Sequence, residues 1–215
     1  MEDYDRNVFI NCPFDDQYFE LLPSLVFTVI SLGFNPCIAL GTFGSSFLRL
    51  DRILELISKS KYSIHDLSRI QATAAGEYYR LNMPFELGLD HGCRHFNDRY
   101  GDKRSLVLAT GQYDYMKAIS DLNGLDIKHH EDNADKLISQ VRSWFIEMGG
   151  VQDPPAPAKI AADYLAFTTQ LFEAKLKKYT SSEKNDAEAY AASDIEAMPF
   201  AQLLAEIQAF IANRD

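Results

Sequence analysis

Short apolar runs alternate with longer amphipathic stretches along the first part of the chain. Four runs are rich in apolar or β-branched residues and are typical of strands: 8–10, 34–40, 61–68 and 105–109. In the stretches between and after them, apolar residues recur at three- and four-residue spacing, which predicts helices. These helices are expected over 18–32, from Ser45 or Ser46 past Ile57, over 85–96 and over 134–148. Because strands alternate with helices, the pattern predicts a parallel sheet covered on both faces.

The number of strand–helix units selects among the parallel folds. Four or five units over residues 1–150 favour an α/β fold with a flavodoxin-like doubly wound parallel sheet. A closed barrel needs about 250 residues and is disfavoured by the length. The proline-rich segment 153–157 then predicts a stiff linker, because proline fixes φ and cannot continue a helix.

Residues 151–215 are predicted to form a linker and a C-terminal helical appendage to the sheet domain. Apolar spacing indicates two helices, over 158–179 and 200–212. The polar segment 180–193 between them is expected to be mobile. The two helices either pack on the sheet domain or form a dimer seam, and the sequence leaves both arrangements open.

The composition is that of a folded globular protein with an acidic balance of charge. Of the 215 residues, 47% are hydrophobic and 24% are charged, which excludes global disorder. The 31 Asp and Glu residues outnumber the 21 Lys and Arg residues, and the net charge is −10. Binding of duplex nucleic acid needs a basic face, so no nucleic-acid partner is expected.

No segment of the sequence predicts a membrane span, a targeting signal or a metal centre. The longest apolar stretch, 21–34, is interrupted by Pro23 and by polar residues and is too short to cross a bilayer. His91 and His95 are spaced i, i+4 but have no HExxH-type partner. The cysteines are three, scattered and without a CxxC pair: Cys12, Cys37 and Cys93. We therefore expect a reduced, cytoplasmic protein without disulfides, a metal or a bound cofactor.

Three polar clusters follow predicted strands or open the next helix. Residues 11–16 follow the first strand, residues 65–69 follow the third, and residues 82–86 begin a helix. In an open parallel sheet, ligands bind beyond the carboxyl ends of the strands, at the point where the strand order reverses. For a flavodoxin-like order that point lies between strands one and three, so the three clusters are expected to converge on one site.

Glu86 is the sharpest candidate for chemistry. It lies one turn into a helix in which Pro84 is expected at the first position, where the helix dipole would keep a carboxylate ionised at neutral pH. Gly88 would leave room for the close approach of a ligand. An ionised carboxylate that faces a cleft can attack, or stabilise, an electron-poor sugar carbon as a nucleobase leaves. The structural alternative is a glutamate in the first turn of an ordinary helix.

Asp66 and a glycine-bearing loop are further candidates. Asp66 follows a strand, a place that suits both a site residue and an Asx turn or helix cap. Its neighbour His65 is expected to point to the opposite face. The loop 41–46 matches neither the P-loop nor the full GxGxxG pattern. It either offers backbone N–H groups to a phosphate, with Arg49 or Arg52 nearby, or forms a capped turn.

Three motifs resemble those of a known superfamily. They are FINCPF at 9–14, IHDLS at 64–68 and MPFELGL at 83–89. In order and spacing, over residues 7–145, the chain resembles the nucleoside 2-deoxyribosyltransferase-like superfamily, which is related in fold to TIR-type NAD-cleaving domains. Those families place a Pro-aromatic turn after strand one, an Asp after the third strand, and a catalytic Glu in a Phe-Glu-x-Gly-like helix start.

The resemblance implies a role for each matching position. Glu86 would be the nucleophile or the carboxylate that stabilises an oxocarbenium ion, and Asp66 would orient the base or the ribose hydroxyls. Phe14 would stack on the base, and the backbone of 11–13 would line the sugar site. The substrate-binding set is predicted as Asn11, Cys12, Pro13, Phe14, Asp15, Ser68, Arg69, Asn82, Met83 and Gly88. These families also use a polar residue from their C-terminal end to hold the substrate, for which Asn123 and Asp126 are candidates.

The expected function is that of an enzyme that cleaves or transfers an N-glycosidic bond through a carboxylate at the ribosyl C1′. Its substrate would be a nucleotide, a nucleoside or an NAD-like molecule, with NAD as substrate rather than cofactor. The alternative is a non-catalytic nucleotide-sensing module of a bacterial defence or signalling system. A third hypothesis is a scaffold that binds protein partners through its acidic surface and terminal helices. The resemblance further implies homo-oligomerisation through the C-terminal helices.

Overall fold

The computed structural model describes seven stretches of the chain, and all structural statements below refer to them. They are residues 3–15, 18–39, 48–69, 81–111, 119–122, 126–180 and 186–214. By its internal contacts the chain divides into two compact units, residues 1–154 and residues 155–215. Each unit is described by itself.

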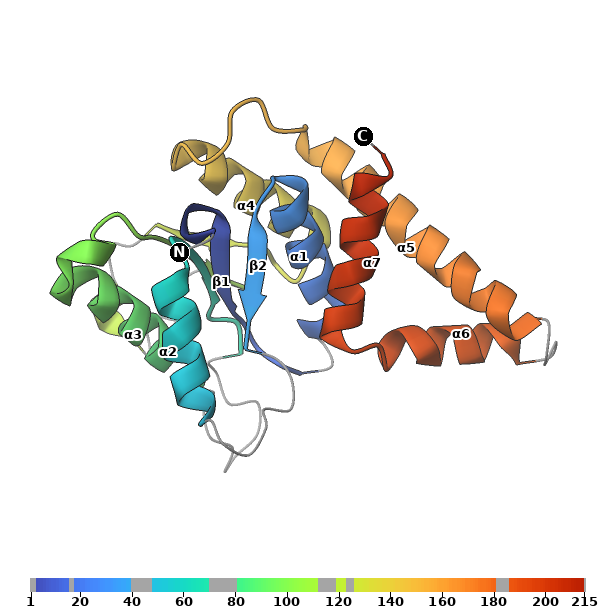
Figure 1. Cartoon of the computed structure of the whole chain (residues 1–215), viewed down its shortest axis with the longest axis horizontal. Coiled ribbons are helices and arrows are strands. Elements are labelled where there is room, and N and C mark those ends of the chain that lie inside the picture. Colours follow the sequence, from blue (N-terminus) through green and yellow to red (C-terminus); the bar gives the residue numbers. More distant parts are fainter. Residues whose placement is uncertain are drawn as a thin grey trace. The chain divides into compact units, whose positions relative to one another are not determined.

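The first unit is built on a five-stranded sheet in which all strand pairs are parallel (Figure 1). The strands are β1 (Asn7–Asn11), β2 (Asn35–Ile38), β3 (Tyr62–Asp66), β4 (Arg104–Ala109) and β5 (Ile127–His129). Their order across the sheet is β2-β1-β3-β4-β5, which is the flavodoxin-like order. The predicted α/β fold is therefore confirmed. The order reverses between β1 and β3, which lie side by side with Asn11 opposite His65.

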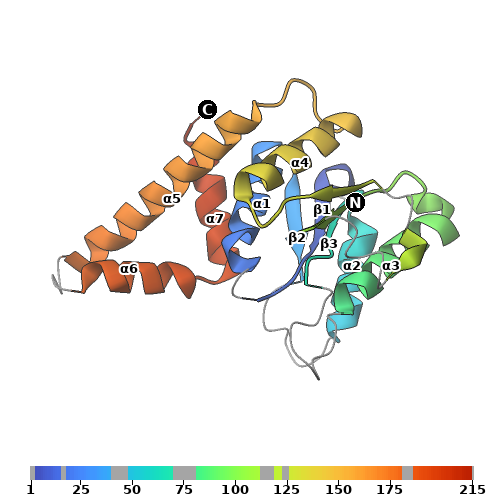
Figure 2. The same cartoon turned by 180° about the vertical axis from the view of Figure 1, so that it is seen from behind.

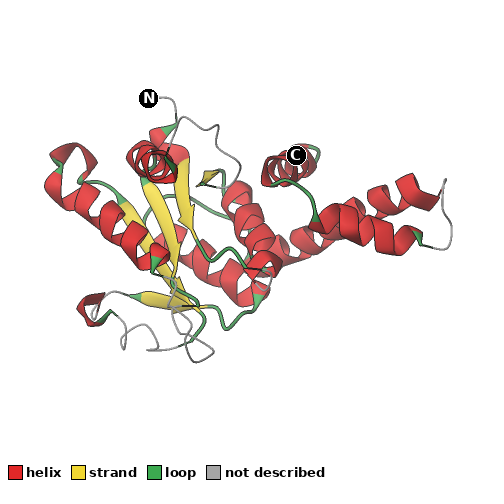
Figure 3. Ribbon diagram, turned by 90° about the horizontal axis from the view of Figure 1, so that it is seen from below, coloured by secondary structure: helices red, strands yellow, loops and turns green. Residues whose placement is uncertain are grey.

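Two pairs of helices cover the two faces of this sheet. The helices are α1 (Leu22–Ser31), α2 (Arg49–Lys59), α3 (Asn82–Phe96) and α4 (Ala134–Glu147). Helix α1 packs with α4 on one face, and α2 packs with α3 on the other (Figures 1 and 2). Figure 3 shows the strands between these helix layers. Both faces of the sheet are thus removed from water, as a parallel sheet requires.

Apolar side chains fill both interfaces between the sheet and the helices. On the α2 side, Phe9 of β1 packs with Ile53, Leu56 and Ile57. Towards β4 and β5, the buried Leu67, Val107 and Ile127 pack with Met83 and Leu87 of α3. On the opposite face, aromatic rings from β3 and α4 meet that of Phe34; Phe34 and Phe145, for example, stack with their ring centroids 4.3 Å apart. The contacts of Met83 and Leu87 hold α3, and with it Glu86, against the sheet.

Four local predictions need correction. Residues 18–20 form a 3₁₀ turn, and α1 begins only at Leu22. Helix α3 begins at Asn82, so Pro84 is its third residue rather than its first. Strand β5 was not predicted, because its three residues include a single buried side chain, that of Ile127. Part of the segment 180–193, expected to be mobile, belongs to helix α6 (Ala187–Glu196), whose buried face consists of small residues that produce no clear apolar pattern.

The second unit consists of α5 (Pro157–Thr180), α6 and α7 (Phe200–Ala212). Helix α5 packs with both α6 and α7. Phe167 of α5 and Phe210 of α7 meet edge to face with ring centroids 5.4 Å apart, and the Tyr179 hydroxyl donates to Asp194 of α6 at 3.0 Å. In the described part of the chain, no single helix is long and apolar enough to cross a membrane; only α6 and α7 taken together, across a 103° bend, satisfy such a criterion.

Candidate active site

A hollow of about 460 Å³ lies where the end of β1 meets the first turns of α2 and α3. Six of its lining residues belong to the predicted site: Asn11, Cys12, Phe14, Asn82, Met83 and Glu86. The other two are Arg49, named beforehand only as a neighbour of a phosphate loop, and Leu81, which the sequence did not single out. The hollow sits beside the switch point between β1 and β3, the place where ligands bind in open parallel sheets.

Glu86 turns a nearly buried carboxyl group towards this hollow. Its side chain is 6% exposed, and no group among the described residues makes a hydrogen bond or an ion pair with it. Burial raises the pKa of Glu86 to about 7, although the positive charge of Arg49 opposes the shift. The expectation that the helix dipole keeps this group ionised is therefore wrong: Glu86 is the fifth residue of α3, beyond the first turn in which the dipole acts.

Arg49 and Phe14 form a second feature of the hollow. The Arg49 guanidinium lies over the Phe14 ring, 5.7 Å from its centroid. Arg49 is also the first residue of α2, where a cation meets the positive end of the helix dipole and gains no stabilisation from it. A cation over an aromatic ring in the lining of a hollow is suited to an anionic ligand that carries a planar group.

Cys12 lines the hollow but is a poor nucleophile. Its thiol is buried, and burial together with the negative charges of Asp66 and Glu86 raises the pKa of Cys12 well above its usual value. The reactive form of cysteine is the thiolate, which is disfavoured here. Of these two groups in the lining, the carboxyl of Glu86 is the candidate nucleophile.

The Asn11 amide is held in place by buried partners. Its Nδ2 donates to the Met83 carbonyl at 2.9 Å and lies 3.0 Å from Nδ1 of His65. His65 is fully buried, and its Nε2 lies 3.1 Å from Oδ2 of Asp90 on α3. Because strand side chains alternate, His65 faces α3 while Asp66 faces the other side, in agreement with the expected alternation.

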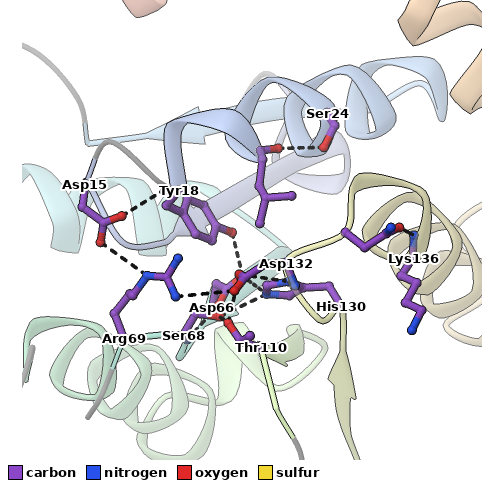
Figure 4. Close-up of polar contacts among 12 residues, drawn as sticks. Asp15, Tyr18, Ser24, Asp66, Ser68, Arg69, Thr110, His130, Asp132 and Lys136 are labelled. Carbon is purple, nitrogen blue, oxygen red and sulfur yellow. Dashed lines mark hydrogen bonds and ion pairs between the residues drawn. The ribbon is translucent and has the colours of Figure 1, made fainter. Parts of the chain in front are cut away.

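Asp66 does not line the hollow. It is fully buried and accepts hydrogen bonds from the Tyr18 hydroxyl at 2.7 Å and from the Ser68 backbone N–H at 2.8 Å (Figure 4). Nε2 of His130 lies 3.0 Å from its Oδ2. Burial alone would raise the pKa of Asp66, but the hydrogen bonds from His130, Ser68 and Tyr18 outweigh it, so that the pKa is lowered. In this arrangement the carboxylate ties β3 to the segments after β1 and β5.

The side chains of a hydrolytic triad meet at Ser68, His130 and Asp66, but their arrangement does not allow the histidine to accept the serine proton. The Ser68 hydroxyl lies 3.1 Å from His130 Nε2. Nδ1 of His130 accepts the Asp132 backbone N–H at 3.1 Å, so the proton of the neutral ring is on Nε2, directed at Asp66 and Ser68. A base must accept the serine proton at that nitrogen, so this group is a structural cross-link of buried loops. His130 and Tyr18 were missed by sequence reasoning, since neither belongs to a recognisable motif.

The remaining predicted site residues do not line the hollow. Arg69 has a positive φ of 71° and stands between two carboxylates, 3.8 Å from Asp15 and 3.6 Å from Asp132. Pro13 and Ser68 are buried away from the hollow, and Gly88 is exposed, with no described atom near enough to require a glycine.

Of the further candidates, Asp126 is exposed and pairs with Lys128 at 2.7 Å. Asn123 and the loop 41–46 lie outside the described residues.

The described residues contain no cluster of three or more histidine, cysteine or carboxylate side chains that could hold a metal ion. His91 and His95 of α3 lie with their ring centroids 4.4 Å apart in an exposed position.

Comparisons of the chain with models of protein families, with curated proteins and with solved structures give no match. The chemistry of the hollow therefore has to be inferred from its own residues.

Proposed function

We propose that this protein cleaves or transfers the N-glycosidic bond of a nucleotide, a nucleoside or an NAD-like substrate, with Glu86 acting at the ribosyl C1′. The observation that carries the proposal is the state of Glu86: a carboxyl that is 6% exposed, lines a hollow and has no partner among the described residues. Burial of an unpaired carboxyl opposes folding, so such groups are concentrated at functional sites.

A sugar carbon that becomes cationic is the reacting group that Glu86 suits best. With a pKa of about 7, the group is ionised in about half of the molecules at pH 7. A positively charged or electron-poor sugar that enters the hollow favours the carboxylate form. The carboxylate then attacks C1′, or stabilises the oxocarbenium ion, while the base leaves with the electron pair of the N-glycosidic bond. Water or a second base subsequently bonds to C1′ and releases the carboxylate, and the proton that this nucleophile loses passes to the departed base, or to solvent where the base leaves as a neutral molecule.

Two other groups of the hollow suit the rest of such a substrate. The Phe14 ring offers a face on which a base can stack, and Arg49 beside it offers a charge for a phosphate. The resemblance of residues 7–145 to the nucleoside 2-deoxyribosyltransferase-like superfamily supports the same assignment, because its three motifs include the end of β1 and the start of α3. Cleavage of NAD would require no strong acid in the hollow, because nicotinamide leaves as a neutral molecule.

A second candidate is a module that binds a nucleotide without cleaving it. It is favoured by the position of Asp66, whose oxygens are occupied by Tyr18, Ser68 and His130. Among the described residues, Glu86 is thus the only carboxyl that lines the hollow. A binding module would show saturable nucleotide binding without turnover.

Incubation with NAD and with a panel of ribo- and deoxyribonucleosides tests the proposal, with base release followed by chromatography. Glu86→Gln is expected to lower base release at least about a hundredfold, because glutamine can neither attack C1′ nor neutralise a positive charge there. Glu147→Gln on the exposed part of α4 serves as the matched control and should retain activity. Undiminished release by Glu86→Gln would remove Glu86 from the mechanism, and binding without release would favour the sensing module.

A further inference from the structure

The orientation of the Asn11 side-chain amide is determined by its partners. A backbone carbonyl only accepts hydrogen bonds, so the group 2.9 Å from the Met83 carbonyl must be the amide nitrogen. The second proton of the same nitrogen is directed at Nδ1 of His65, 3.0 Å away. Both donors of Asn11 are thereby used within the protein. Its Oδ1, in a residue that lines the hollow, has no donor among the described residues.

His65 connects Asn11 to the buried, charged side chain of Asp90. Because its Nδ1 accepts from Asn11, its ring proton is on Nε2, 3.1 Å from Oδ2 of Asp90. Asp90 forms an ion pair with Lys103 at 3.0 Å and accepts the Ser63 hydroxyl at 2.6 Å. Burial opposes ionisation of Asp90, but His65, Lys103 and Ser63 outweigh it and lower its pKa, so Asp90 is a permanent acceptor.

The chain Lys103–Asp90–His65–Asn11 is buried along its whole length: its members are 0%, 1%, 0% and 3% exposed. Buried charge pairs contribute little net stability, because desolvation offsets their attraction. This chain ends at Asn11, a residue that lines the hollow and whose Oδ1 has no donor among the described residues, whereas the network of Asp66 and His130 on the other side of β3 is closed within the protein. A positioning role explains that difference.

We infer that Asn11 is a positioning residue whose Oδ1 accepts a hydrogen bond from a sugar hydroxyl of the substrate; the inference rests on the proposed function. An acceptor without a donor of its own excludes carbonyl, carboxylate and phosphate oxygens from this point. Asn11 is hydrogen-bonded to the carbonyl of Met83, which precedes Glu86 by about one helical turn. With Glu86 acting at C1′, the donor close to Asn11 is therefore a hydroxyl of the sugar. A group that contacts Asn11 beside Glu86 is close to the reacting C1′.

Kinetics with sugar analogues tests this assignment. The ratio of kcat/KM between the best ribonucleoside substrate and its 2′- or 3′-deoxy analogue is measured in both proteins, because this comparison cancels the intrinsic effect of the hydroxyl on the N-glycosidic bond. The ratio is expected to be about tenfold or more higher in the wild-type protein than in Asn11→Ala, in which the acceptor is gone. Asn7→Ala is the matched control: Asn7 lies on the same strand and donates to the Lys59 carbonyl at 2.9 Å, but does not line the hollow. It should retain the wild-type ratio.

Each kinetic outcome has a distinct meaning. An Asn11→Ala variant that still discriminates between the sugars as the wild type does overturns the inference and leaves the proposed function intact. A variant that instead loses discrimination between adenosine and inosine assigns Asn11 to the base and overturns the sugar assignment. A wild-type protein that neither cleaves nor binds any nucleoside or NAD overturns the proposed function and this inference with it.

A measurement on the unmodified protein covers the case in which Asn11→Ala does not fold. Nitrogen-15 NMR of the five histidines is expected to show His65 with its proton on Nε2, the resonance being assigned by its loss in His65→Gln. A proton on Nδ1 would require Asn11 to turn its oxygen towards His65. That result would leave Asn11 without an acceptor for the substrate and would overturn the inference.

Discussion

Glu86 and Asp90 lie one turn apart on α3, both almost fully buried, in opposite electrostatic situations. Asp90 is surrounded by Lys103, His65 and the hydroxyls of Ser63 and Ser105, and its pKa is lowered. Glu86 faces the hollow without a partner among the described residues, and its pKa is raised to about 7. Environments that push the pKa values of neighbouring carboxyls apart are typical of sites where one carboxyl reacts and the other supports the structure.

Base release is expected to increase with pH through about 7. The reacting form of Glu86 is the carboxylate, and the pKa of this group is raised to about 7 by burial. The rate should therefore increase up to this pH and become constant above it. Initial rates measured from pH 5 to pH 9 at fixed ionic strength determine the profile. A rate that decreases through this range would indicate that Glu86 acts as an acid instead.

Glu86→Gln is expected to stabilise the folded protein at pH 8. The pKa of Glu86 is raised from 4.5 to about 7, so between these values the folded state binds more protons and stability falls as the pH rises. Well above pH 7 the whole penalty is present, about 3 kcal/mol, and glutamine removes it.

Urea unfolding at pH 8 and at pH 4 measures this difference. At pH 4 the carboxyl is largely protonated in both states, so the gain should nearly disappear. Glu147→Gln, at an exposed position of α4, controls for the general effect of a removed charge. An unchanged unfolding free energy of Glu86→Gln at pH 8 would show that the carboxyl is not desolvated.

Asp90→Asn is expected to destabilise the protein by about 3–5 kcal/mol at pH 7, because it leaves Lys103 buried without its counter-charge. The pKa of Asp90 is lowered, so its stabilisation is present at neutral pH and is lost as the pH falls below the ordinary aspartate range. Chemical unfolding of the variant measures the loss. Asp135→Asn, in the exposed first turn of α4, is the control, and an equal effect of both substitutions would contradict the role of the Lys103 pair.

Tyr18→Phe separates the two roles proposed for Asp66. It removes the 2.7 Å hydrogen bond to a buried carboxylate and should cost about 1–3 kcal/mol of unfolding free energy. Because Tyr18 and Asp66 do not line the hollow, base release by the folded variant should stay within about twofold of wild type. A folded variant whose base release falls far below this twofold limit would indicate that Asp66 takes part in the reaction.

Phe14→Ala is expected to weaken substrate binding about tenfold, since a stacked base contributes about 1–3 kcal/mol. The effect should appear mainly in KM, because stacking holds the base in the ground state and in the transition state alike. Phe96→Ala, at a side chain that is 93% exposed, is the control. Equal KM values for Phe14→Ala and the wild-type protein would place the base elsewhere in the hollow.

The fold class was predictable because it depends on local patterns. The apolar runs that became β1, β3 and β4, and the helical spacing between them, are properties of short segments. The convergence of the end of β1 with the start of α3 also followed, since parallel strands end at the same edge of the sheet. Strand β5 and helix α6 escaped notice because their buried faces are too short or too small to form a pattern.

The state of each polar side chain was decided only by the tertiary structure. The sequence predicts Glu86 and Asp66 as a catalytic pair. In the structure, however, the Asp66 carboxylate interacts with Tyr18 and His130, which lie 48 and 64 residues away along the chain. Asn11 obtains its orientation from Met83 and His65 in the same manner. Whether a carboxyl is charged or an amide has a free acceptor depends on burial and on partners contributed by distant segments. No local pattern of residues contains that information.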